Sequence, residues 1–117
     1  MLPQLSAAVR VFLCTRPTDM RKGFDGLTGL VQECFGQDLL TGHLFLFLNR
    51  RRDRLKILYF DRDGLVIWYK RLEAGSFEMP STTERDGVEL QPAQLAMILS
   101  GIDLSSARQR KRFQHAG

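Results

Sequence analysis

The chain has 117 residues, of which 44% are hydrophobic and 26% are charged, and its formal net charge is +4. This length allows one folded domain whose core needs no metal ion or disulfide bond to hold it together. No apolar run is long enough to cross a membrane as a helix, and the N-terminus lacks the pattern of a secretory signal peptide. We therefore expect a cytoplasmic protein without a membrane partner.

Charge is distributed unevenly along the chain. Residues 1–48 carry equal numbers of basic and acidic side chains, residues 49–71 carry +5, residues 72–104 carry −5 and residues 105–117 carry +4. The basic zone can attract phosphate, and the acidic zone can attract a basic partner. We expect a single domain over residues 1–104, followed by a basic, disordered tail.

The first predicted strand covers residues 9–14. Val9, Val11 and Leu13 alternate onto one face of it, and the proline at position 17 disfavours further pairing.

A helix is predicted next, over residues 19–35. Thr18-Asp19 offers an N-cap and Gly36 a C-cap. Arg21 and Asp25 have the spacing of an ion pair on the solvent side. The apolar stripe of this helix consists of Met20, Phe24, Leu27, Leu30, Val31, Cys34 and Phe35.

Three glycines, Gly23, Gly26 and Gly29, lie three residues apart inside this predicted helix. Each costs about 1 kcal/mol relative to alanine in a helix interior. The favoured interpretation is that the glycine ridge packs tightly on the protein's own sheet, where close approach needs a missing side chain. The alternative is that the ridge binds a partner protein.

The remaining elements are mostly strands. Residues 43–48 are apolar on both faces and predict a central strand covered on both sides. Residues 55–61 and 65–71 surround an Asp-Gly pair and predict a hairpin. A short strand near 88–90 and a short helix over 92–99 follow. The predicted fold is α+β, in which an antiparallel meander and the N-terminal strand pack against the main helix.

The register of the hairpin depends on its turn. A three-residue loop that ends at Gly64 places Lys56 opposite Lys70, where like charges repel. A four-residue loop would place Lys56 opposite Tyr69. The three-residue loop is the preferred prediction, with the two lysines splayed apart or neutralised by an anion.

Residues suited to catalysis do not form a recognisable set. Asp61 and Asp63 lie beside a turn glycine, so a hairpin turn explains them better than a metal pair. A metal-dependent nuclease is the least favoured alternative, because no acid stands two positions before Lys56 or Lys70.

Other chemistry is equally sparse. Cys14 and Cys34 each lie in an apolar run, which favours reduced core cysteines over a disulfide. With two histidines in the chain, no zinc set is expected. The sequence also lacks a glycine-rich phosphate loop and a nucleophile with an evident histidine base. We expect no enzymatic activity, no cofactor, no metal and no small-molecule substrate.

The candidate binding surface is the basic cluster around the hairpin. Arginine forks match phosphate oxygens in pairs, which favours contact with duplex DNA, and a merely solvated loop is the competing explanation. Tyr59, Trp68 and Tyr69 lie nearby, and core packing is a better explanation of these rings than base stacking. The candidate nucleic-acid-binding residues are Arg50, Arg51, Arg52, Arg54, Lys56, Lys70 and Arg71.

Several motifs follow one another in the order of a known family. They are TDMRKGFDGL (residues 18–27), GHLF (42–45), NRRRDRLKIL (49–58), Asp63-Gly64, KRLEAGSF (70–77), Leu90, Gln94-Leu95 and GID (101–103). Over about residues 9–104 the chain resembles the small accessory proteins, called TnpB or Orf2-like, of bacterial insertion sequences of the IS66 class. It departs from the family's usual pattern at Leu39 and Met79, where proline and tryptophan are usual, and both departures are interpreted as packing changes.

The resemblance implies a role in transposition beside a separate, larger transposase, and it implies no catalytic residue in this chain. Together with the basic cluster at residues 49–71, this resemblance leads us to expect a non-catalytic accessory protein that is associated with DNA. The alternative is an adaptor that binds the transposase, through the ridge of Gly23, Gly26 and Gly29, without touching DNA.

Overall fold

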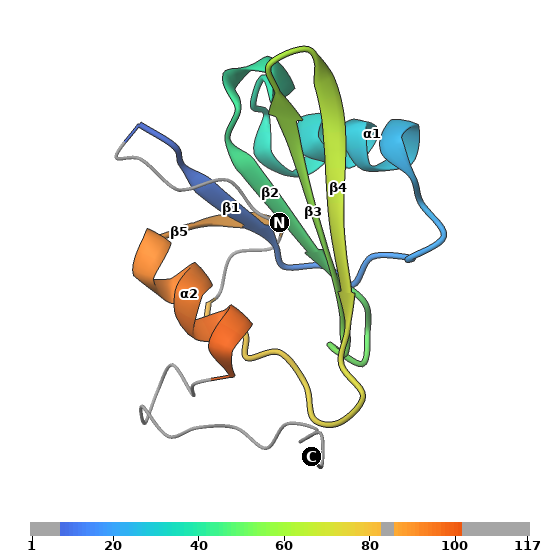
Figure 1. Cartoon of the computed structure of the whole chain (residues 1–117), viewed down its shortest axis with the longest axis vertical. Coiled ribbons are helices and arrows are strands. Elements are labelled where there is room, and N and C mark those ends of the chain that lie inside the picture. The colour runs from blue at the N-terminus through green and yellow to red at the C-terminus, as the bar shows by residue number, and fades with distance from the viewer. Residues whose placement is uncertain (1–7, 83–85, 102–117) are drawn as a thin grey trace.

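The centre of the fold is a sheet with the strand order β4-β3-β2-β1-β5 (Figure 1). We describe it from a computed structural model of the chain, which defines residues 8–82 and 86–101. The predicted tail at 105–117 lies outside these residues. The elements are β1 (Val11–Cys14), α1 (Phe24–Phe35), the 3-10 turn η1 (Leu39–Thr41), β2 (Leu44–Leu48), β3 (Arg54–Asp61), β4 (Gly64–Arg71), β5 (Gly87–Leu90) and α2 (Pro92–Ser100).

The sheet is mixed. β2, β3 and β4 form the predicted antiparallel meander, and β5 runs antiparallel to β1 at the opposite edge. β1 and β2 are parallel neighbours, which the sequence analysis did not predict. A parallel pair needs a long crossover connection, and α1 with η1 supplies it. The α+β class is confirmed.

The two helices lie on opposite faces of the sheet (Figure 1), and each covers its own core. Both faces of β2 are therefore buried, as the apolar run at 43–48 predicted. The α1 side is built from Phe12, Cys14, Leu27, Val31, Leu39, Phe45, Phe47 and Leu58. The α2 side includes Val11, Leu13, Leu44, Leu46, Ile57, Phe77, Leu95 and Ile98.

The main helix begins at Phe24, so the predicted start at residue 19 is wrong. The glycine before it occupies the N-cap without a side-chain hydrogen bond. The preceding segment stays non-helical because the Nζ of Lys56 binds the carbonyl oxygens of Met20 and Lys22, each at 2.8 Å. Those oxygens would otherwise accept hydrogen bonds from amides one turn further along a helix.

Two side chains near this helix start also differ from expectation. Arg21 pairs with Asp19 rather than with Asp25, at 2.7 Å. Phe24 was placed on the apolar stripe, but its side chain is 48% exposed. At the other end the prediction is confirmed, because Gly36 caps the helix in the left-handed conformation.

The hairpin is confirmed, but its three-residue loop is wrong. Asp61 pairs with Gly64, so the turn consists of two residues, of which Arg62 has a φ of 56°. This register places Lys56 opposite Tyr69, the pairing predicted for a longer loop. It avoids the repulsion of two opposed lysines and places the Lys56 ammonium 4.8 Å from the centre of the Tyr69 ring.

The two cysteines are free, as predicted. Cys14 and Cys34 are far apart in the sequence but close together in the fold, where their Sγ atoms lie 3.6 Å apart. Arg16 donates a hydrogen bond to the Cys34 sulfur at 2.7 Å. Burial raises the pKa of the Cys14 thiol to about 11.

Among the described residues, no helix has the length and apolar character needed to span a membrane.

Candidate nucleic-acid interface

The connection between β2 and β3, residues 49–53, is called the arginine turn here. Asn49 organises it. The Asn49 side-chain oxygen accepts hydrogen bonds from the backbone amides of Asp53 and Arg54, at 3.1 and 3.0 Å. The Asn49 side-chain amide donates to the Asp53 carboxylate at 2.6 Å. The turn is therefore tied to the start of β3 by one side chain.

A second set of hydrogen bonds holds the turn from the segment after β4. The amide of Phe77 donates to the carbonyl of Arg52, and the amide of Leu72 donates to the carbonyl of Asp53, each at 2.7 Å. Phe77 is itself buried in the core. Arg52 adopts a left-handed backbone with a φ of 59°, which these contacts sustain. The backbone of the turn is thus connected to the packed interior.

The arginine side chains of the turn remain outside this network. Arg50, Arg51 and Arg52 are exposed, and Arg54 is partly buried. Within the part of the chain that the structure describes, none of the four forms an ion pair. Their guanidinium groups are therefore open to an external anion.

The structure places Lys56 differently from these arginines. Its side chain is buried, with 8% of its surface exposed. Two carbonyl oxygens and the Tyr69 ring surround its ammonium group. The charge of Lys56 is therefore used to attach the segment after β1 to the hairpin.

Lys70 and Arg71 lie at the expected end of the hairpin but on different faces. Arg71 pairs with Arg54 across β3 and β4, and its guanidinium binds Glu73 at 2.9 Å. Lys70 is opposite Leu55, whose side chain belongs to the core on the α2 side. The predicted cluster is thus divided, and the arginine turn with Arg54 is the part that remains together.

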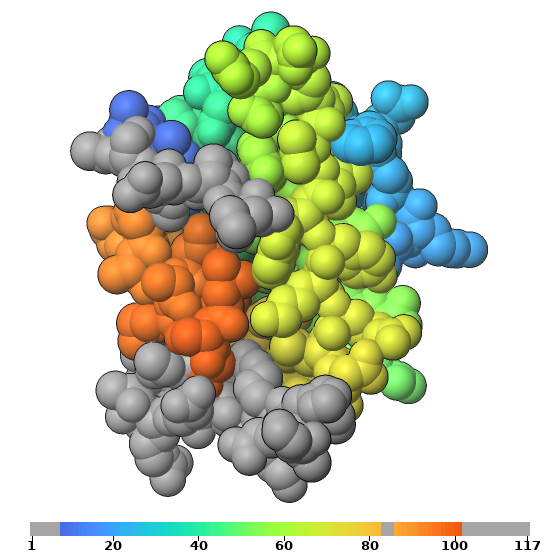
Figure 2. All heavy atoms as spheres, in the orientation of Figure 1, coloured from blue at the N-terminus to red at the C-terminus, as the bar shows by residue number. Residues whose placement is uncertain are grey.

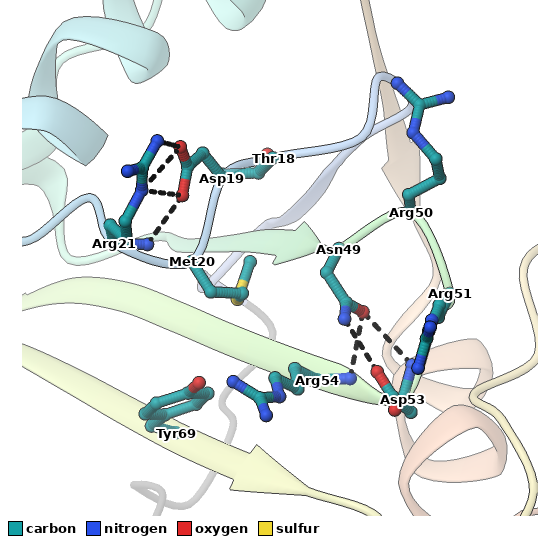
Figure 3. Close-up of a pocket in the computed structure, with 10 residues that line it drawn as sticks. All are labelled: Thr18, Asp19, Met20, Arg21, Asn49, Arg50, Arg51, Asp53, Arg54 and Tyr69. Atoms are coloured by element: carbon teal, nitrogen blue, oxygen red, sulfur yellow. Dashed lines mark hydrogen bonds and ion pairs between the residues drawn. The ribbon is translucent and has the colours of Figure 1, made fainter.

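A pocket of about 490 Å³ adjoins the arginine turn (Figure 3). Three segments form it: the connection after β1, the arginine turn with the start of β3, and β4. Figure 2 shows the first two, in blue and green, on the same side of the molecule. The lining residues are Thr18, Asp19, Met20, Arg21, Asn49, Arg50, Arg51, Asp53, Arg54 and Tyr69.

The sequence does not predict the contribution of residues 18–21 to this pocket, because it predicts an N-cap and the first turn of a helix there. Their only signal was the TDMR sequence within the family motif. Asp19 accepts two hydrogen bonds from the Arg21 Nε and Nη2 and one from its backbone amide. These bonds lower the pKa of Asp19 to about 2. The pocket holds four guanidinium groups and two carboxylates, so it carries net positive charge.

The glycine ridge does not pack on the sheet, so the favoured interpretation of it is wrong. A Cβ atom added at Gly23 or Gly29 would meet no atom within 4 Å. At Gly26 the nearest atoms belong to the Lys22 side chain, at 3.1 Å. The buried side of the helix is formed instead by Leu27, between Gly26 and Gly29, and by Val31, beyond Gly29. Binding of a partner at the ridge remains a prediction.

No group of three or more histidine, cysteine, aspartate or glutamate side chains suited to a metal occurs among residues 8–82 and 86–101. Asp61 and Asp63 are exposed at the β3–β4 turn, where the sequence analysis placed them. They lie at the opposite end of the hairpin from the arginine turn.

Comparison with known proteins gives two kinds of match. The family model described as IS66 Orf2-like protein matches residues 9–109, which include the arginine turn, the pocket and both helices. An uncharacterized protein of Sinorhizobium fredii (strain NBRC 101917 / NGR234), y4hO, is 43% identical over 103 residues, 88% of each chain. A second uncharacterized protein of the same strain, y4jC, is 31% identical over 106 residues, 90% of this chain and 89% of its own. No solved structure matches.

Proposed function

The chain belongs to the family of IS66 Orf2-like proteins, which makes it an accessory protein of an insertion sequence, and we propose that it holds DNA through its arginine turn. The observation that carries this proposal is that Arg50, Arg51 and Arg52 are exposed on a backbone fixed by hydrogen bonds to the interior. The DNA is that of the element's ends or its target, and a separate transposase performs the chemistry.

The physical basis is the match between guanidinium groups and phosphates. Each exposed arginine donates paired hydrogen bonds to phosphate oxygens and releases counterions from the DNA. A rigid turn presents these donors without the loss of entropy that ordering a mobile loop would cost. The lack of ion pairs at Arg50, Arg51, Arg52 and Arg54, within the described ranges, means that no internal carboxylate competes for them.

The test is binding to labelled duplex DNA, measured by fluorescence anisotropy between about 50 and about 200 mM salt. We expect affinity to fall steeply with salt. Changing Arg50, Arg51 and Arg52 to alanine is expected to weaken binding and to lower the slope of log affinity against log salt by about 2 to 3, since each phosphate contact contributes about 0.9.

Arg62→Ala is the matched control, because Arg62 is an exposed arginine in the turn at the other end of the same hairpin. It is expected to leave the slope close to that of the wild type. A flat salt response, or equal effects of Arg62→Ala and of a single change in the arginine turn, would contradict the proposal.

A second function is favoured by the open ridge on α1. Gly23 and Gly29 have free space where a side chain would lie, and Phe24, which follows Gly23, is 48% exposed. In this alternative the chain is an adaptor that binds the transposase of the same element through α1, without direct contact with DNA.

The adaptor alternative is tested with Gly29→Leu, since the open space at Gly29 accommodates a side chain without disturbing the fold. Capture by the tagged transposase should be lost in Gly29→Leu and retained when the three arginines are changed. The opposite pattern, retention in Gly29→Leu and loss in the arginine variant, would exclude α1 as the docking surface.

A further inference from the structure

We propose that the pocket beside the arginine turn takes one unstacked nucleotide of a DNA strand, with its base on the Tyr69 ring and the adjoining phosphates on the guanidinium groups. This inference rests on the proposed function and specifies the form of DNA that the site prefers. The preferred DNA contains an unpaired or distorted position, and a regular duplex binds through its backbone alone.

The first support is the position of Tyr69. Of the three rings near the basic cluster, Tyr59 is buried and Trp68 packs against the core on the α2 side, as the sequence analysis expected. Core packing, which the sequence predicts for all three rings, is wrong for Tyr69, because this ring is 47% exposed and lines the pocket. An exposed ring beside cationic groups is the arrangement with which proteins bind the bases of single strands, because every base has a face that can stack.

The second support is the way in which this ring is held. The Lys56 ammonium lies 4.8 Å from the ring centre, and the same ammonium binds the carbonyls of Met20 and Lys22. One buried cation thus fixes the ring relative to the segment that forms the opposite wall of the pocket. A stacking surface that is already ordered loses little entropy when a base binds.

The third support is size. The pocket volume of about 490 Å³ lies within the range of sites that hold one small ligand, which runs from about 300 to about 1,000 Å³. A base pair inside a duplex cannot enter such a pocket. A nucleotide that is already unpaired enters at the least cost, because unstacking and unpairing cost a few kcal/mol in a regular duplex.

The fourth support is the distribution of charge around the pocket. In Figure 3, Arg54 extends toward Tyr69, whereas Arg50 points away from it toward the outside. These positions suit the phosphates on either side of one nucleotide. The two carboxylates of the pocket are engaged by their neighbours, Asp19 by Arg21 and Asp53 by Asn49.

The test compares three DNAs of one sequence: a regular duplex, the same duplex with one unpaired 2-aminopurine nucleotide, and the corresponding single strand. We expect the wild-type protein to bind the bulged duplex about 5-fold to 100-fold more tightly than the regular duplex, the gain typical of one stacked base. Tyr69→Ala is expected to abolish this preference, and Tyr69→Phe is expected to retain it. Binding to the regular duplex, and its salt slope, should be the same in the wild type and in Tyr69→Phe.

Phe24→Ala is the matched control, because Phe24 is an aromatic residue of similar exposure outside the pocket lining. It should leave the preference for the bulge unchanged. The emission of 2-aminopurine, which reports stacking, should change on binding to the wild type and to Tyr69→Phe.

Equal affinity for bulged and regular duplexes, with no change of emission, overturns this inference. If the duplex still binds in a salt-dependent way through the arginine turn, the proposed function stands and the nucleotide pocket alone is wrong. If none of the three DNAs binds, both proposals are wrong. If Tyr69→Ala fails to fold, the comparison of wild type with Tyr69→Phe and the emission of the probe still decide the question.

Discussion

Lys56 is the residue whose role changed most between sequence and structure. It was predicted to contact phosphate, and its ammonium group instead joins two backbone carbonyls and an aromatic ring. A buried cation of this kind holds a connection in place because its three donors all find partners in the protein. The late start of α1 follows from the same contacts.

We predict that Lys56→Met lowers the free energy of unfolding by about 1 to 3 kcal/mol, since it leaves two carbonyls without a charged donor. Urea denaturation measures this loss. Lys70→Met is the matched control, because Lys70 lies at the same end of the hairpin, is exposed, and has no ion pair in the described part of the chain. A similar loss in both variants would show that the Lys56 contacts contribute little.

At the scale of elements, the glycines differ in whether other atoms occupy the space that a side chain would need. Gly87 begins β5, and a Cβ atom there would overlap the Phe35 ring, so this glycine allows α1 to approach the edge of the sheet. Gly29 lies in α1 with no atom near its missing side chain. The regular spacing of Gly23, Gly26 and Gly29 is visible in the sequence, whereas only the packing of α1 on β5 reveals the need for Gly87.

The two glycines give opposite predictions. Gly87→Ala is expected to lower the free energy of unfolding by about 1 to 3 kcal/mol through overpacking against Phe35. Gly29→Ala is expected to raise it by about 0.5 to 1 kcal/mol, since alanine is the better helix former and the space is open. Thermal and urea denaturation measure both. A stabilising Gly87→Ala, or a destabilising Gly29→Ala, would contradict this packing.

The contact between β1 and α1 gives another prediction. Cys14 and Cys34 have their sulfur atoms 3.6 Å apart, so a small movement brings them to the length of a disulfide bond. A mild thiol oxidant such as diamide is expected to join them within one chain, protecting both from alkylation. A bond that closes a loop of this length stabilises by about 3 kcal/mol.

Mass spectrometry after alkylation measures the expected bond, and urea denaturation measures its effect. Cys34→Ser serves as the control, since it cannot form the link. Dimers joined between chains, or full alkylation of both residues after oxidation, would show that the two sulfur atoms cannot approach further.

At the scale of the whole molecule, charge is arranged in two basic zones. One is the zone at 49–71, of which the arginine turn is the open part, and the other is the stretch 105–117 with four basic residues and no acidic one. Because phosphate contacts made by separate groups contribute independently to counterion release, the two zones should act additively on DNA affinity.

We predict that changing Arg108, Arg110, Lys111 and Arg112 to glutamine weakens duplex binding without removing the effect of the arginine-turn substitutions. The salt slopes of the tail variant, the arginine-turn variant and their combination, measured by fluorescence anisotropy, form a double-mutant cycle. Additive slopes are the expected result. A combined variant no weaker than the arginine-turn variant would show that the tail takes no part in binding.

Most of the architecture was predictable because it depends on local patterns. The alternation of apolar residues in β3 and β4, the apolar run of β2 and the proline and glycine that bound α2 each specify an element through neighbours in the chain. The family model matches residues 9–109, the stretch in which the motifs of the sequence follow one another. The sequence by itself thus determined most of the elements, the family and the position of the basic turn.

The tertiary structure alone decided which of the basic groups remain available and what lies beside them. The burial of Lys56, the pairing of Arg71 with Glu73 and the placement of Lys70 on the α2 side all depend on strand register and on contacts between distant segments. The pocket likewise requires residues 18–21 to meet β4. Such contacts join residues far apart in the chain, and they exist only once the sheet has brought those residues together.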